Sequence, residues 1–79
     1  MDIESFKNEA LVNDIGFIYL DKEYSIIMDN NSYIAVDSDD NVTNFNKYND
    51  VYKDLEDLLD NWIIEGKPLK EIVGNIKLL

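Results

Sequence analysis

Hydrophobic residues recur at helical spacing in the second half of the chain, most clearly between residues 50 and 65. The apolar positions there follow an i, i+4, i+7, i+8, i+11, i+12 pattern, which gives one wide stripe on an α-helix: Val51, Leu55, Leu58, Leu59, Trp62 and Ile63. Asn49 or Asp50 is the expected N-cap, and Gly66 is placed to end this central helix in a left-handed turn. Pro68 fits the first turn of a further helix, which we expect to run to about Lys77.

The first half of the chain begins with helical spacing and then changes period. Ile3, Phe6 and Ala10 predict a short helix over residues 2–12, with Asp2 as its cap. Between residues 16 and 46, four short segments rich in β-branched and aromatic residues alternate with polar turn clusters, which is typical of an antiparallel meander. We expect these strand residues to face inward: Phe17, Tyr19, Tyr24, Ile26, Ile34, Val36 and Phe45.

Together these segments predict a single α+β domain over residues 1–79. It has a short N-terminal helix, an antiparallel meander sheet of three to four strands, and two C-terminal helices packed on one face. The central helix must lay its apolar stripe on the sheet, because a domain of this size offers no other surface to cover it.

Charge narrows the classes of partner. The chain has 17 Asp and Glu against 7 Lys and Arg, which gives a formal net charge of −10. Such a surface is repelled by nucleic acid and by anionic membranes, so we expect a basic protein partner, such as a nuclease or a nucleic-acid-binding protein. The alternative is that the charge serves solubility alone. The N-terminus has no basic and apolar leader pattern, and no apolar run is long enough to span a bilayer, so we expect a cytoplasmic protein.

The inventory of reactive residues argues against catalysis. Cysteine, histidine and arginine are absent, so the commonest nucleophile, general base and phosphate clamp are missing, and we expect neither enzyme activity nor a cofactor. The turn Asp37-Ser38-Asp39-Asp40-Asn41 matches the first three ligands of a calcium loop. However, Val42 and Tyr48 stand where that loop needs Gly and Glu, so we predict a hairpin turn and no metal site.

The polar side of the central helix is the strongest candidate for a partner-binding surface. Asp50, Asp54 and Asp57 are predicted to form one row with a carboxylate every ~4.5–6 Å, beside a second row of Glu56 and Asp60. The acidic turn residues Asp37, Asp39 and Asp40 would extend this surface if they lie nearby. The alternative is a solvated helix face that has no partner.

Two segments carry a resemblance to a class of known proteins. They are Lys22-Glu23-Tyr24-Ser25-Ile26 and Glu65-Gly66-Lys67-Pro68-Leu69-Lys70-Glu71-Ile72. In these segments and in its acidity the chain resembles small α+β proteins from phages and prophages of low-GC Gram-positive bacteria. That class includes anti-CRISPR and anti-restriction proteins that mimic DNA. The resemblance implies an inhibitor that presents carboxylates to a basic nucleic-acid-binding groove of a host defence protein.

The other hypothesis is a structural or regulatory protein-interaction domain that uses an apolar patch. Its basis is the apolar C-terminal segment Ile76-Lys77-Leu78-Leu79, which is expected either to pack on the sheet or to form a homodimer contact. Both a monomer and a homodimer are consistent with the sequence.

Overall fold

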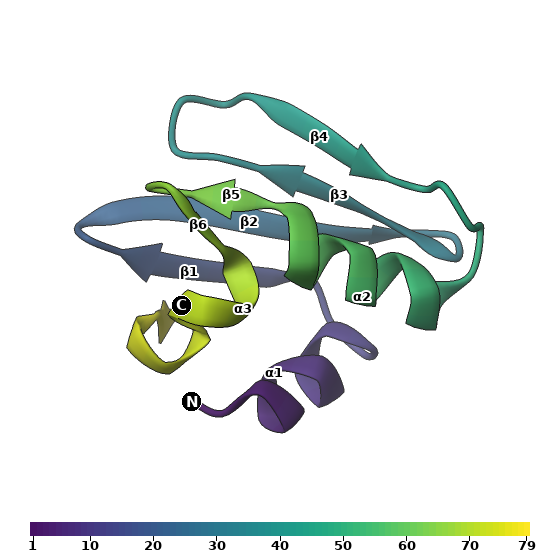
Figure 1. Ribbon diagram of the computed structural model, residues 1–79, viewed down its shortest axis with the longest axis horizontal. Helices are drawn as coiled ribbons and strands as arrows, with labels where there is room; N and C mark the ends of the chain where they lie inside the picture. The colour runs from purple at the N-terminus through teal and green to yellow at the C-terminus, as the bar shows by residue number, and fades with distance from the viewer.

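The computed structural model describes all residues 1–79 as an α+β structure with a five-stranded antiparallel sheet and three helices (Figure 1). The sheet has the order β4-β3-β2-β1-β7. Its strands are β1 (Ile15–Tyr19), β2 (Lys22–Asp29), β3 (Ser32–Val36), β4 (Val42–Phe45) and β7 (Lys77–Leu78). The α-helices are α1 (Ile3–Ala10), α2 (Val51–Asn61) and α3 (Leu69–Ile72). None of them is long and apolar enough to cross a membrane.

The N-terminal helix and the meander are confirmed. Asp2 caps α1, since its Oδ1 accepts a hydrogen bond from the Ser5 amide at 2.8 Å, and Phe6 and Ala10 are buried. All three helices contribute buried residues to one hydrophobic core with the inner face of the sheet. The predicted inward residues Phe17, Tyr19, Tyr24, Ile26 and Phe45 are buried in that core, as expected.

The predicted side-chain alternation of β3 is wrong by one residue. Ile34 and Val36 are only half-buried, whereas Tyr33 and Ala35 are 1% and 0% exposed. The register pairs Ala35 with the inward Ile26, and opposite residues point to the same face. Tyr33 can be buried because its hydroxyl group has a hydrogen-bond partner: it donates to the Ala10 carbonyl at 2.8 Å. Burial raises the pKa of Tyr33 to about 12, so this donor stays protonated.

The central helix ends earlier than its apolar stripe predicts. Trp62 already has an extended backbone, and Ile63, expected in the stripe, is 58% exposed. A small hairpin follows, formed by β5 (Ile63–Ile64) and β6 (Lys67–Pro68), with Glu65 at φ 51° and Gly66 at φ 80° in its turn. Gly66 therefore serves a hairpin rather than a helix end, because the type I′ turn of a two-residue hairpin loop requires positive φ at both central residues. Trp62 packs edge-on against the rings of Phe17 and Tyr24, at centroid distances of 6.2 and 6.0 Å.

The last predicted helix is also shorter, and the C-terminus forms a strand. α3 continues only as a 3₁₀ turn, η1 (Val73–Asn75), which contains the poor helix former Gly74. Lys77 and Leu78 then pair with β1, and the Leu79 amide donates to the Gly16 carbonyl at 2.9 Å. The C-terminal segment thus packs on the sheet, which has five strands instead of the expected three to four.

Candidate functional site

The outward side of α2 carries a shallow hollow of about 520 Å³, referred to below as the α2 hollow. Two exposed tyrosines, Tyr48 and Tyr52, begin a row that continues one helical turn at a time through Glu56 and Asp60. The lining is completed by residues beside this row. The full set is Tyr48, Tyr52, Lys53, Glu56, Asp57, Asp60 and Asn61.

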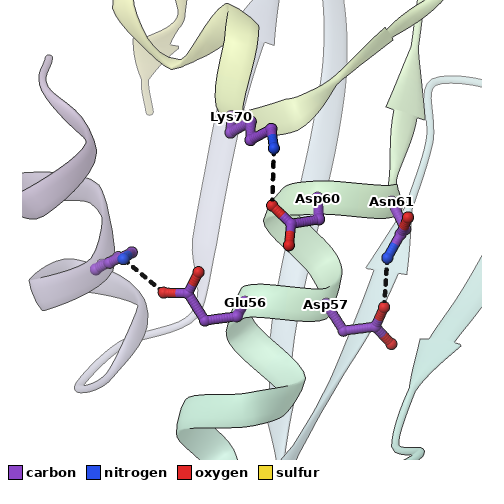
Figure 2. Close-up of polar contacts among 6 residues, drawn as sticks. Glu56, Asp57, Asp60, Asn61 and Lys70 are labelled. Carbon is purple, nitrogen blue, oxygen red and sulfur yellow. Dashed lines mark hydrogen bonds and ion pairs between the residues drawn. The ribbon is translucent and has the colours of Figure 1, made fainter.

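The three carboxylates of the hollow are partly engaged by their neighbours, as Figure 2 shows. Lys7 of α1 forms an ion pair with Glu56, and the Lys70 Nζ of α3 lies 3.1 Å from the Asp60 Oδ1. Asn61 donates through Nδ2 to the Asp57 Oδ1 at 2.6 Å. The hydrogen bond that Lys7 donates to Glu56 raises the pKa of Lys7 above its ordinary value. The two ion pairs link α2 to α1 and α3, but solvent-accessible pairs of this kind contribute little to stability and exchange readily for other cations.

Asp54 does not lie on the acidic face, and the prediction that placed it there is wrong. Its side chain is 0% exposed and its carboxylate accepts three hydrogen bonds: from the Ser32 hydroxyl at 3.1 Å, the Tyr48 amide at 3.0 Å and the Asp50 amide at 3.2 Å. Burial alone would raise the pKa of Asp54, but these donors outweigh burial and hold it below the ordinary 3.8. Asp54 therefore joins the start of α2 to β3 and cannot meet a partner.

A signal for this burial was present in the sequence. Asp54 lies three residues after Val51 and four before Leu58, both of which belong to the apolar stripe. A charged residue flanked in this way sits at the border of the buried face, where it needs internal partners.

Asp50 is the N-cap of α2, as expected, and its carboxylate is used for that purpose. Its Oδ1 accepts hydrogen bonds from the Tyr52 amide at 2.9 Å and the Lys53 amide at 3.1 Å. These are amides that the first turn of the helix leaves without a partner. Asp50 does not line the α2 hollow.

The acidic turn between β3 and β4 is separate from the α2 hollow. The Asp37 Oδ1 accepts from the amides of Asp39 and Asn41, each at 2.9 Å, and these bonds lower the pKa of Asp37. The hydrogen bond that Lys22 donates to Glu65 raises the pKa of Lys22. Figure 1 shows the β3–β4 turn at the same end of the sheet as the β1–β2 turn. Asp37, Asp39 and Asp40 therefore do not extend the helix face, because none of them lines the hollow.

Tyr48 and Tyr52 are the site residues that sequence reasoning missed. They fall at i and i+4 with Glu56 and Asp60, outside the apolar stripe, and this spacing is the signal that could have found them. Chemically, the hollow offers carboxylate acceptors beside two phenol rings. This combination suits guanidinium and ammonium groups, which pair with carboxylates and lie over aromatic faces.

Comparisons with known proteins add no functional assignment to this geometry. No protein-family model matches the chain, and searches among curated proteins and solved structures found no similar protein.

Proposed function

We propose that this chain is a small non-catalytic binding protein that presents the α2 hollow to a basic protein surface. The proposed partner is a host defence nuclease, which the hollow would contact at the nucleic-acid-binding groove. The observation that carries the proposal is the combination, in one hollow, of two exposed tyrosines with Glu56, Asp57 and Asp60. Tyrosine is enriched at protein interfaces, because its ring supplies a large apolar contact area and its hydroxyl a hydrogen-bonding group.

The proposed contact set is narrower than the eight carboxylates named from the sequence. Asp50 and Asp54 are engaged in capping and in the interior, and Asp37 organises its own turn. Glu56, Asp57 and Asp60 remain at the hollow, while Asp39 and Asp40 lie apart from it. The net charge of −10 supports the choice of a basic groove, since it steers a cationic partner over long range.

On binding, Glu56 and Asp60 would exchange Lys7 and Lys70 for cations of the partner. The exchange is inexpensive because Glu56, Asp60 and Lys70 are each about half exposed, and Lys7 is 27% exposed. A partner arginine can gain a bidentate contact with a carboxylate and also lie over a tyrosine ring. Blockage of the groove would follow from occupation alone, with no chemical step.

The experiment is inhibition of DNA cleavage by a panel of Cas effectors and restriction endonucleases at low salt. Wild-type protein should inhibit at least one enzyme, and E56Q/D57N/D60N should inhibit it at least tenfold less. The control E4Q/E23Q/E71Q removes as many negative charges from exposed residues outside the hollow, and it should inhibit nearly as well as wild type. No inhibition across the panel, or an equal loss in the control, would contradict the proposal.

A second candidate function is a protein-interaction domain that uses an apolar surface. The observation that favours it is the partly exposed apolar side of the sheet opposite the helices, where Ile27 is 38% and Val42 59% exposed. Binding through that surface would depend little on salt, whereas binding through the α2 hollow would weaken steeply as salt rises. Measurement of partner affinity at low and high salt therefore separates the two candidates.

A further inference from the structure

The sheet has one edge that lacks the usual protection against pairing. β4 is the last strand on its side, and Figure 1 shows no element beyond it. Val42, Thr43 and Asn44 are all exposed, and the strand contains neither a charged residue nor proline. By contrast, the strand at the other edge, β7, is only two residues long and begins with a lysine. Short length, charge and proline are the devices that blunt sheet edges, and β4 has only its modest length.

The hydrogen-bonding phase of β4 identifies which backbone groups face outward. The Asp37 amide donates to the Asn41 carbonyl at 3.0 Å. In the β3–β4 register, the residues two and four positions further on, Thr43 and Phe45, are then the other hydrogen-bonded positions. Val42 and Asn44, which alternate with them, therefore direct their amides and carbonyls away from β3 towards solvent.

We propose that this edge is a self-association site, where two copies of the chain join antiparallel through β4. One register uses every outward group of the strand. It places Thr43 opposite Thr43 of the other copy on the two-fold axis and pairs Val42 with Asn44 on each side. The paired side chains then point to the same face of the joined sheet, as antiparallel pairing requires. Opposed threonines are also a favourable cross-strand pair.

The charges at the two ends of β4 identify a second copy as the partner. Asp39 and Asp40 precede the strand, and Lys47 follows it. Antiparallel pairing places the acidic turn of one copy beside Lys47 of the other, and the symmetry repeats this contact. Lys47 pairs with no carboxylate of its own chain, and its Nζ lies 5.4 Å from the centroid of the Tyr48 ring. One short segment thus supplies both halves of a complementary pattern.

The general repulsion between two chains of charge −10 opposes this contact, so the dimer is expected to be weak. Sedimentation of the full chain at about 150 mM salt should show dimers by about 1 mM protein. Hydrogen exchange should slow with concentration at the amides of Val42 and Asn44, but not at those of Thr43 and Phe45. A monomer up to about 1 mM, or a dimer without this protection, would overturn the proposal.

Backbone variants test the edge itself. V42P removes one outward amide at the first position of the strand, where proline is tolerated, and should abolish dimers while circular dichroism remains that of the folded protein. V42A keeps the amide and should still form dimers. A V42P protein that is folded and still dimeric would refute pairing along β4. If V42P does not fold, the charge variants below give the decision.

Charge variants test the antiparallel symmetry. D39K and K47D each place like charges at both ends of the β4–β4 contact. Each variant alone should therefore associate at least about tenfold more weakly than wild type. An equal mixture of the two restores opposite charges at both ends, and it should form heterodimers about as well as wild type forms homodimers. Asp39 is chosen because Asp40 has φ 64°, which lysine adopts reluctantly. A mixture that associates no better than its components would overturn the proposed arrangement.

Discussion

At the scale of single residues, Asp54 shows that helical spacing alone does not decide whether a carboxylate is exposed or buried. On a helical projection it belongs to an acidic row with Asp50 and Asp57, yet in the fold it is fully buried. Desolvation of a carboxylate is costly, and the donors from Ser32, Tyr48 and Asp50 offset that cost. The residue is therefore structural, and a reversal of its charge would unfold the chain instead of probing a binding surface.

The first prediction concerns D54N. The amide side chain presents a donor where two backbone amides and a hydroxyl already donate, so the free energy of unfolding should fall by about 2 kcal/mol at pH 7. Urea unfolding at pH 7 measures this loss. D39N, at an exposed turn position, is the control and should stay close to wild type. An equal stability of D54N and wild type would show that the buried hydrogen bonds contribute nothing.

The second prediction is the pH dependence of the same difference. The pKa of Asp54 is lowered in the folded state, so the unfolded chain binds this proton more tightly. The contribution is complete above the unfolded pKa, near 3.8, and is lost as the pH falls through the folded pKa. The stability gap between wild type and D54N should therefore narrow when urea unfolding is repeated from pH 7 down to about pH 3. A constant gap over that range would contradict the assignment.

At the scale of elements, the hairpin turns decide where the regular structure begins and ends. The β1–β2 turn consists of Leu20 at φ 50° and Asp21 at φ 62°, both left-handed. Tight hairpins favour this geometry because it matches the twist of the strands, but a leucine adopts it at a cost. Leu20 is also 63% exposed, so burial of its side chain offsets little of that cost.

The third prediction is that L20N stabilises the protein. Asparagine tolerates the left-handed region and should raise the free energy of unfolding by about 0.5–1 kcal/mol, which thermal unfolding can detect. L20A keeps the unfavourable backbone angle and is the matched control, so it should not stabilise. A loss of stability in L20N would instead indicate that the Leu20 side chain makes contacts worth more than the strain.

At the scale of the whole molecule, the charged residues are distributed unevenly, and β4, at one edge of the sheet, has none. The 17 acidic residues serve several purposes: N-caps at Asp2 and Asp50, a turn at Asp37, the interior at Asp54, and ion pairs on α2 and β5–β6. Much of the excess negative charge is still unpaired and repels itself in the compact state. The acidity is thus a cost to folding that a binding role would justify.

The fourth prediction follows from this repulsion. An increase in NaCl from about 10 mM to about 150 mM shortens the screening length from about 30 Å to 8 Å, so thermal stability should rise. E4Q/E23Q/E71Q removes three of the exposed charges, and its gain from the same salt step should be smaller. Stability that falls with added salt would mean that the ion pairs outweigh the repulsion.

Local sequence patterns by themselves determined much of the secondary structure of this protein. They predicted α1 with its Asp2 cap, the four meander strands, the Asp50 cap of α2, and most of the apolar stripe of α2. Helical spacing, β-branched runs, caps and turn residues act over a few positions, so short windows of sequence carry that information. Helical spacing also brings Tyr52, Glu56 and Asp60 of the α2 hollow onto one side of α2.

Only the tertiary structure decided the remaining features, because each depends on a partner far away in the chain. The side-chain phase of β3 follows from its pairing with β2 and from the Tyr33 bond to Ala10. The burial of Asp54 requires Ser32, and the C-terminal strand requires the edge of β1. A hydrogen bond across many residues leaves no local periodicity. Helical spacing places Asp54 at the border of the buried face, but only the fold supplies the Ser32 donor for its carboxylate, and only the fold turns the C-terminal tail into a strand.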